Sequence, residues 1–97
     1  MIKSFKHKGI EEFFLSGSKK GIIPEHTGTL SRILDRLDAS MQPEDMNLPS
    51  YKLHPLIGRD KGRWAVSVNG NWRIIFEFMD QDAIPVDYED YHKEVLV

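Results

Sequence analysis

Residues 64–78 read WAVSVNGNWRIIFEF, and this stretch decides the fold. On both sides of Asn69-Gly70, apolar side chains alternate with small or polar ones over five or more residues. Such alternation is typical of half-buried strands, and an Asn-Gly pair between two of them indicates a tight turn. The stretch therefore predicts an antiparallel hairpin with one face toward a core.

The register of this hairpin follows from parity. The apolar sets of the two strands share one face only if Val68 pairs with Trp72, which predicts a three-residue loop at 69–71. In that register Arg73 lies opposite Ser67, on the face away from the core. Trp64 and Trp72 are expected to be core residues.

Upstream of the hairpin the apolar period is helical. Residues 10–15 carry apolar side chains at i, i+3 and i+4, and Gly17 and Gly21 are suited to ending that helix. Pro24 suits the first position of a second helix. Its apolar face consists of Leu30, Ile33, Leu34 and Leu37, whereas Arg32, Asp35 and Arg36 should meet water.

Three further strands are expected, at residues 2–5, at 51–53 and at 83–88. Pro85 lacks a backbone donor, so the last of them should lie at an edge or contain a bulge. The order of elements predicts an α+β fold in one domain, 1–97, with two N-terminal helices packed on one face of a small, mainly antiparallel sheet.

Composition narrows the class of protein. The chain has 97 residues and no cysteine, which fits a reducing compartment. Its N-terminus lacks the apolar stretch of a secretion signal, and no apolar run approaches membrane-spanning length. We therefore expect a soluble, cytoplasmic protein that does not contact a membrane.

The net charge of −2 hides an uneven distribution. Residues 1–79 hold twelve Lys or Arg against nine Asp or Glu, whereas residues 80–97 hold one Lys against six acids. A body of about +3 can touch a few phosphates but is far from the basic stripe of an autonomous RNA binder. If the protein acts on RNA, something else should help to present the substrate.

The residue types that RNA cleavage without a metal requires lie in three separate stretches. A base must remove the proton of a ribose 2′-hydroxyl, an acid must protonate the leaving oxygen, and cations must hold the phosphate. The candidates for these catalytic roles are His54, Arg73, Asp90, Tyr91 and His92. Candidates for contact with RNA are Lys52, Arg59, Lys61, Arg63 and Asn71.

Each candidate also has an ordinary structural interpretation. A histidine after a strand is commonly a surface residue, and Arg73 has Glu77 and Asp87 available as cross-strand ion-pair partners. Tyr91 could pack against a helix. His7 and His26 are assigned to the surface. The histidines never fall at a metal-binding spacing, and no phosphate loop or nucleophile elbow is present.

Four pieces of the sequence occur together and in order in one known family. They are Ile2-Lys3-Ser4-Phe5, Leu53-x-x-Leu56-x-Gly58, the run 68–74 and Asp90-Tyr91-His92. In these pieces the chain resembles the HigB-type toxins of the RelE/ParE superfamily, over roughly residues 1–92. The resemblance implies a compact α+β toxin of a type II toxin–antitoxin system that cleaves messenger RNA in the ribosomal A site and uses no metal cofactor.

The resemblance also implies partners and roles. The partners are the ribosome with its messenger RNA and a HigA-type helix-turn-helix antitoxin, through which alone the toxin meets operator DNA. His54, Asp90, Tyr91 and His92 match positions implicated in catalysis. Asn71 and Arg73 match positions that contact substrate or phosphate.

Two residues depart from the family pattern. Ile57 and Asn69 stand where some relatives have basic residues, so positive charge is missing from the expected phosphate site. A toxin that binds DNA gyrase without catalysis, as ParE relatives do, is therefore an alternative. Another is a degenerate member that acts only through its antitoxin.

Overall fold

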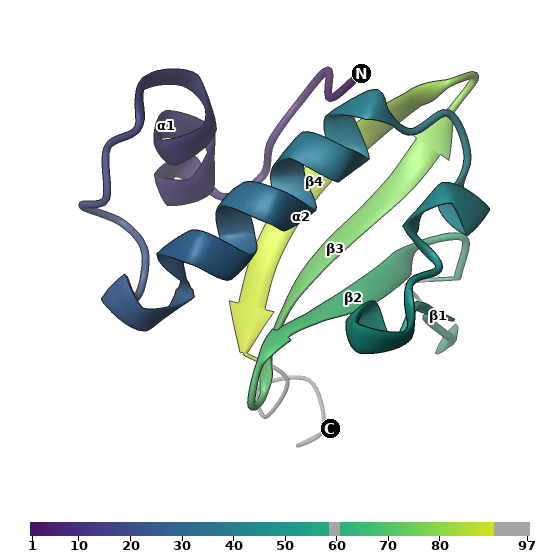
Figure 1. Ribbon diagram of the computed structural model, residues 1–97. Helices are drawn as coiled ribbons and strands as arrows, with labels where there is room; N and C mark the ends of the chain where they lie inside the picture. Colours follow the sequence, from purple (N-terminus) through teal and green to yellow (C-terminus); the bar gives the residue numbers. More distant parts are fainter. Residues whose placement is uncertain (59–60, 91–97) are drawn as a thin grey trace.

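The computed structural model describes residues 1–58 and 61–90, which form two α-helices followed by a four-stranded antiparallel sheet (Figure 1). The strand order is β1-β2-β3-β4, so each strand lies beside its neighbours in sequence. The elements are α1 (Lys8–Ser16), α2 (Thr27–Ala39), β1 (His54–Pro55), β2 (Trp64–Asn69), β3 (Trp72–Met79) and β4 (Asp82–Asp90). The expected α+β class is confirmed.

Both helices form in the predicted stretches, but α2 begins at Thr27 and not at Pro24. The His7 side chain caps α1 by accepting from the Ile10 N–H, and Gly17 ends the helix at φ 80°, a left-handed conformation that suits glycine. Pro24 opens a 3₁₀ turn, η1 (Pro24–His26), that leads directly into α2. The polar face of α2 is exposed as expected.

The core forms where α2 lies across the sheet (Figure 1). Four apolar residues of α2 are completely or almost completely buried, and they belong to one cluster with Phe76 and with neighbours from β2, β3 and β4. Trp64 and Trp72 are half-buried against this cluster. Burial of each large side chain contributes roughly 1.5–3 kcal/mol, so this helix is the main partner of the sheet.

The β2–β3 hairpin confirms one part of the predicted register and corrects another. Ser67 pairs with Arg73 as expected, but Trp72 pairs with Asn69, and the register shifts between the two pairs. Val68 and Asn69 together therefore oppose Trp72, which is a β-bulge. The bulge keeps Val68 in the core and leaves a two-residue turn, Gly70-Asn71, instead of the predicted three-residue loop.

β4 is an edge strand with an irregularity at Pro85, as predicted for this proline. The register with β3 shifts between Ile75 and Glu77, so that two β4 residues lie opposite Phe76. The predicted strand at 2–5 is wrong. Instead, this segment makes two isolated parallel bridges to β4, at Ile2 and Phe5.

The predicted strand at residues 51–53 is also wrong. Two further 3₁₀ turns, η2 (Pro43–Met46) and η3 (Pro49–Tyr51), precede the sheet. η3 begins at a proline, and Lys52 follows in the left-handed region at φ 52° and ψ 50°. A left-handed residue cannot continue an extended chain, so pairing starts only at His54.

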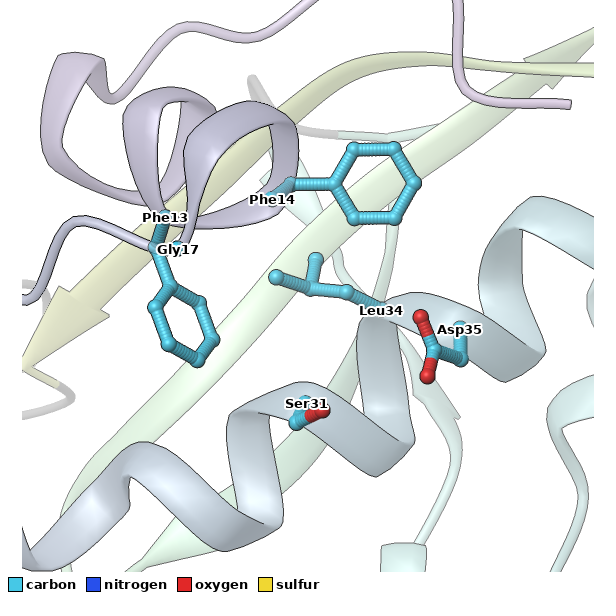
Figure 2. A pocket seen from close by; sticks show the side chains of 6 residues that line it. All are labelled: Phe13, Phe14, Gly17, Ser31, Leu34 and Asp35. Carbon is cyan, nitrogen blue, oxygen red and sulfur yellow. The ribbon is translucent and has the colours of Figure 1, made fainter.

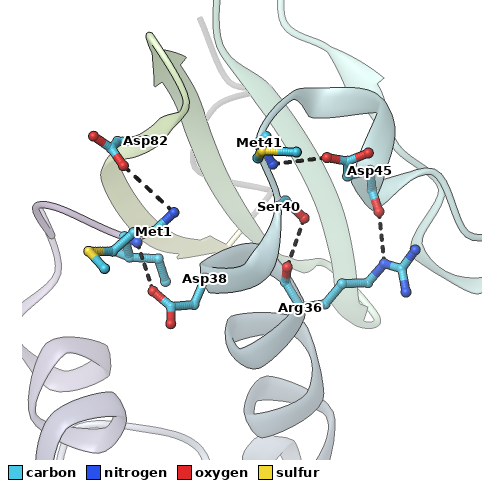
Figure 3. Close-up of polar contacts among 8 residues, drawn as sticks. Met1, Arg36, Asp38, Ser40, Met41, Asp45 and Asp82 are labelled. Atoms are coloured by element: carbon cyan, nitrogen blue, oxygen red, sulfur yellow. Dashed lines mark hydrogen bonds and ion pairs between the residues drawn. The ribbon is translucent and has the colours of Figure 1, made fainter.

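Polar contacts fix the N-terminus and the turn after α2 (Figure 3). The Met1 ammonium pairs with Asp82 at 3.7 Å, and the Ile2 N–H donates to Asp38 at 2.9 Å. Beyond α2, Asp45 accepts from the Met41 N–H, and its carbonyl accepts from Arg36 Nε at 2.8 Å. These contacts tie both the chain start and η2 to α2.

A shallow groove lies between the two helices (Figure 2). It is lined by Phe13, Phe14, Gly17, Ser31, Leu34 and Asp35. Its aromatic wall comes from α1 and its polar rim from α2. In the described part of the chain, no helix has both the length and the apolar character needed to cross a membrane.

Candidate active site

The face of the sheet away from α2 carries two of the candidate catalytic residues, His54 and Arg73. Directly paired residues of antiparallel strands point to the same side. His54, Ala65, Ile75 and Asp87 therefore form one row across all four strands, and Ser67, Arg73 and Glu89 form the next. Neither row contributes to the hydrophobic cluster under α2.

His54 and Arg73 meet on this face. Nη1 of Arg73 lies 3.4 Å from Nε2 of His54, although the two residues are 19 positions apart in sequence. The other ring nitrogen of His54, Nδ1, lies 2.9 Å from the backbone oxygen of Lys52. Arg73 thus lies on the face away from the core, as the parity of the hairpin predicted, and His54 reaches it there.

These two contacts fit one protonation state of His54. A carbonyl oxygen only accepts hydrogen bonds, so Nδ1 must carry the proton. A guanidinium only donates, so Nε2 must present its lone pair to Arg73. The result is a neutral imidazole with an unprotonated Nε2, the form in which histidine can act as a base.

Arg73 is more enclosed than a residue on an open sheet face would be. It is 6% exposed, and the side chains of Ala65 and Ile75 on the same face are 0% and 1% exposed. Its position on the polar face was predicted, but its burial was not.

The register separates the two carboxylates at the end of β4. Glu89 pairs with Arg73, whereas Asp90 pairs with Trp72, whose side chain packs against the core. Asp87 lies one row away, is 5% exposed, and accepts from the Tyr88 N–H at 2.8 Å. The sequence analysis overlooked Glu89. Its position opposite Arg73 becomes visible only when the pairing of β4 with β3 is known.

The expected RNA contacts fall in different places. Lys52, Lys61 and Asn71 are exposed, whereas Nη2 of Arg63 donates to the Pro85 carbonyl at 3.4 Å and so reaches β4. Arg59, Tyr91 and His92 lie outside the described residues.

His26 is not a surface residue, so that prediction is wrong. It is 4% exposed, and its Nδ1 lies 2.6 Å from the hydroxyl of Tyr88, which is 3% exposed. The Trp72 ring lies against Tyr88 with a centroid distance of 4.6 Å. Burial raises the pKa of Tyr88, and a backbone hydrogen bond from Ile23 partly offsets the rise.

This buried group lies on the opposite side of the sheet from the His54–Arg73 pair. Trp72 is the neighbour of Arg73 in β3, and Tyr88 is the neighbour of Glu89 in β4. Successive residues of a strand face opposite sides of the sheet, so in each strand one residue belongs to the buried group and the next faces the other side. Sequence reasoning missed His26 because a single histidine after a proline turn carries no periodic signal. Among residues 1–58 and 61–90, no three His, Asp or Glu side chains are grouped so that they could hold a metal ion.

Comparison with known proteins identifies the family. Residues 3–92 match the family model described as the RelE-like toxin of the type II toxin–antitoxin system HigB. The chain is 41% identical to Endoribonuclease HigB of Proteus vulgaris over 92 residues, which cover 95% of this chain and all of that protein. It is 33% identical to Toxin HigB-1 of Vibrio cholerae over 95 residues, or 96% of this chain and 99% of the relative. The chain therefore belongs to the HigB-like family of RelE-like toxins of type II toxin–antitoxin systems.

Proposed function

We propose that this protein is an endoribonuclease toxin that cuts messenger RNA in the ribosomal A site by general acid–base chemistry without a metal cofactor. The observation that carries the proposal is the contact between His54 and Arg73, which sets an unprotonated imidazole nitrogen beside a guanidinium. The relative named as an endoribonuclease matches the chain along nearly its full length. Both observations support RNA cleavage over a purely binding role.

The chemistry uses the ribose 2′-hydroxyl as the nucleophile. Nε2 of His54 takes the hydroxyl proton while the oxygen attacks the phosphorus, and Arg73 stabilises the charge that develops on the phosphoryl oxygens. The bond to the 5′-oxygen then breaks, and that oxygen takes a proton from an acid, leaving a 2′,3′-cyclic phosphate. We assign the acid to the run 90–92, which contains Asp90, Tyr91 and His92. Because Asp90 pairs with Trp72 on the core side of the sheet, Tyr91 and His92 are the preferred candidates.

Arg73 has a second part in this scheme. In the free protein its Nη1 donates to the same nitrogen that must accept the 2′-hydroxyl proton. A phosphate draws the guanidinium into a charge-assisted, bidentate hydrogen bond, which is stronger than one to a neutral imidazole. Substrate binding therefore replaces Arg73 with the 2′-hydroxyl at Nε2 and frees the base at the moment it is needed.

Primer extension on messenger RNA after brief induction tests the reaction. The protein should produce discrete in-frame cuts, and His54→Ala, Arg73→Ala and His92→Ala should abolish them. General acid–base groups each contribute roughly 10²–10⁴-fold, and loss of a donor that stabilises transition-state charge costs about 10²–10³-fold. Arg32→Ala, on the exposed face of α2, is the matched control and should cut normally. Intact transcripts during growth arrest would contradict the proposal, and DNA damage with normal translation would point to gyrase instead.

The expected RNA-contacting residues are Lys52, Arg59, Lys61, Arg63 and Asn71. These residues are proposed to hold the messenger RNA backbone and the codon near the site, while the ribosome supplies most of the positioning.

A type II system pairs its toxin with a protein antitoxin. We propose that the antitoxin is a HigA-type helix-turn-helix protein that carries the complex to operator DNA, and that both proteins act in the cytoplasm. Co-expression of the neighbouring short open reading frame with the tagged toxin should give a stable complex, and separate elution of the two proteins would refute the pairing.

The fold is proposed to follow the RelE/ParE arrangement, with both helices on one face of the sheet.

A further inference from the structure

We propose that Lys52 is a positioning residue, whose left-handed backbone fixes the tautomer of His54 and so makes Nε2 the base. The inference rests on the proposed function for its catalytic consequence, but the tautomer itself is a property of the free protein. It concerns the backbone of Lys52, not the side chain that was expected to contact RNA.

The first step is the backbone conformation. Lys52 has φ 52° and ψ 50°, and it is one of two non-glycine residues with positive φ in residues 1–58 and 61–90. Lysine has no short side chain that compensates for this conformation by hydrogen bonding locally, as Asn and Asp do. Such outliers persist only where the surrounding structure determines them, and they occur preferentially at functional sites.

The second step is what the conformation achieves. It follows directly after η3 and turns the chain so that the Lys52 carbonyl lies 2.9 Å from Nδ1 of His54, two residues later. An extended residue at position 52 would place successive carbonyls on opposite sides of the chain. The ψ angle of a residue sets the direction of its carbonyl, and Lys52 has ψ 50° where a strand residue would have roughly 115–135°. The left-handed conformation therefore directs this carbonyl to the place where the imidazole meets it.

The third step is the consequence for the ring. The hydrogen bond made by one imidazole nitrogen sets which nitrogen carries the proton. Because the Lys52 carbonyl holds the proton at Nδ1, the lone pair at Nε2 is directed at Arg73, where the phosphate is proposed to bind. Without this carbonyl, only the 3.4 Å contact with Arg73 would favour this tautomer. Once phosphate draws Arg73 away, nothing would keep the proton at Nδ1, and part of the population would present an N–H where the base must be.

Matched substitutions separate the backbone from the side chain. Lys52→Gly and Lys52→Val both remove the ammonium group, but only valine is strongly disfavoured at positive φ. Lys52→Asn serves as the conservative rescue, because asparagine tolerates the left-handed region. Asp80→Val introduces comparable strain at φ 58° in the turn between β3 and β4 and controls for general destabilisation.

Two measurements are made on each folded variant. Nitrogen-15 chemical shifts of the His54 ring report the tautomer at a pH where the ring is neutral, and kcat and KM are measured separately with ribosome-bound messenger RNA. The wild type, Lys52→Gly, Lys52→Asn and Asp80→Val should show a protonated Nδ1 and an unprotonated Nε2. In Lys52→Val the two shifts should converge, and kcat should fall roughly tenfold or more below that of Lys52→Gly, with similar KM.

A wild-type ring protonated at Nε2, or the same tautomer in Lys52→Val as in Lys52→Gly, would overturn the inference. Equal kcat values for these two variants despite different tautomers would overturn its catalytic part. The spectra need no RNA, so a wrong tautomer counts against this inference whatever the protein cleaves. Absent cleavage by a protein with the expected tautomer counts instead against the proposed function.

Discussion

Two histidines of this protein are each held by hydrogen-bonding partners, and the two groups lie on opposite sides of the sheet. His54 faces a guanidinium and a carbonyl, which can only donate and only accept, so its protonation state follows from its neighbours. His26 faces the hydroxyl of Tyr88, which can do either. The first arrangement prepares a base, whereas the second ties β4, the neighbour of the strand that carries Arg73, to the start of α2.

The buried Tyr88–His26 hydrogen bond makes a prediction about stability. Tyr88→Phe removes the hydroxyl and leaves Nδ1 of the buried His26 without its partner at 2.6 Å. We expect the free energy of unfolding to fall by about 1–3 kcal/mol in urea titrations. Tyr51→Phe, at a half-buried tyrosine without a side-chain hydrogen bond among the described residues, is the control and should cost under about 0.5 kcal/mol.

The same tyrosine predicts a pH dependence. Burial raises the pKa of Tyr88 above its ordinary value of 10.0, so the folded state holds this proton more tightly than the unfolded state does. The corresponding stability is complete below pH 10 and is lost as the pH rises through the higher folded value. The stability difference between wild type and Tyr88→Phe should therefore narrow above pH 10; a constant difference would show that the hydroxyl is not shielded.

At the scale of elements, features set by a local pattern could be predicted from the sequence, whereas local irregularities of the backbone could not. Alternation around Asn69-Gly70 correctly placed Arg73 opposite Ser67, because parity holds along any regular strand. The same parity failed at Val68, because a bulge adds one residue without changing the composition of the strand. The left-handed conformation of Lys52 could not be predicted from the sequence either, since lysine has no preference for that conformation.

The candidate site shows the same division. Parity predicted the face on which Arg73 lies, and the family resemblance pointed to His54 and Arg73 as site residues. Their contact and the burial of Arg73 and His26 depend instead on residues distant in sequence. Glu89 and Asp90 are adjacent carboxylates, and only the pairing of β4 with β3 shows which of them lies opposite Arg73. Residue types thus indicated the chemistry, and tertiary contacts decided the geometry.

Alanine substitutions at two glycines of the helices should change stability in opposite directions. Gly17 ends α1 at φ 80°, whereas Gly28 lies within α2, where an added Cβ would meet only the Arg32 side chain at 3.6 Å. Gly17→Ala should lower the free energy of unfolding by about 1–2 kcal/mol, since alanine is disfavoured in the left-handed region. Gly28→Ala should raise it by about 0.5–1 kcal/mol because glycine weakens a helix. Urea titrations check both, and changes of the same sign would contradict the assigned backbone conformations.

At the scale of the whole molecule, charge limits what the protein can do alone. The body, residues 1–79, has about three more basic than acidic residues, and the last eighteen residues have an acidic excess of five. Affinity for single-stranded RNA depends on the number of phosphates neutralised, and few basic residues here are available for that role. Arg73, the best placed of them, is 6% exposed. This charge balance supports the proposal that the ribosome positions the substrate.

This balance of charge predicts how the purified toxin responds to ribosomes. With free messenger RNA, cleavage should be slow and should weaken further as salt is raised, because it depends on a few phosphate contacts. With programmed ribosomes the same RNA should be cut at least about 100-fold faster, since fixing the phosphodiester in place removes much of the entropic barrier to reaction. His54→Ala with ribosomes controls for contaminating nuclease and should leave the RNA intact. Equal rates on free and ribosome-bound RNA would show that the protein positions its substrate itself, and that its own few cations suffice to hold the phosphate beside His54.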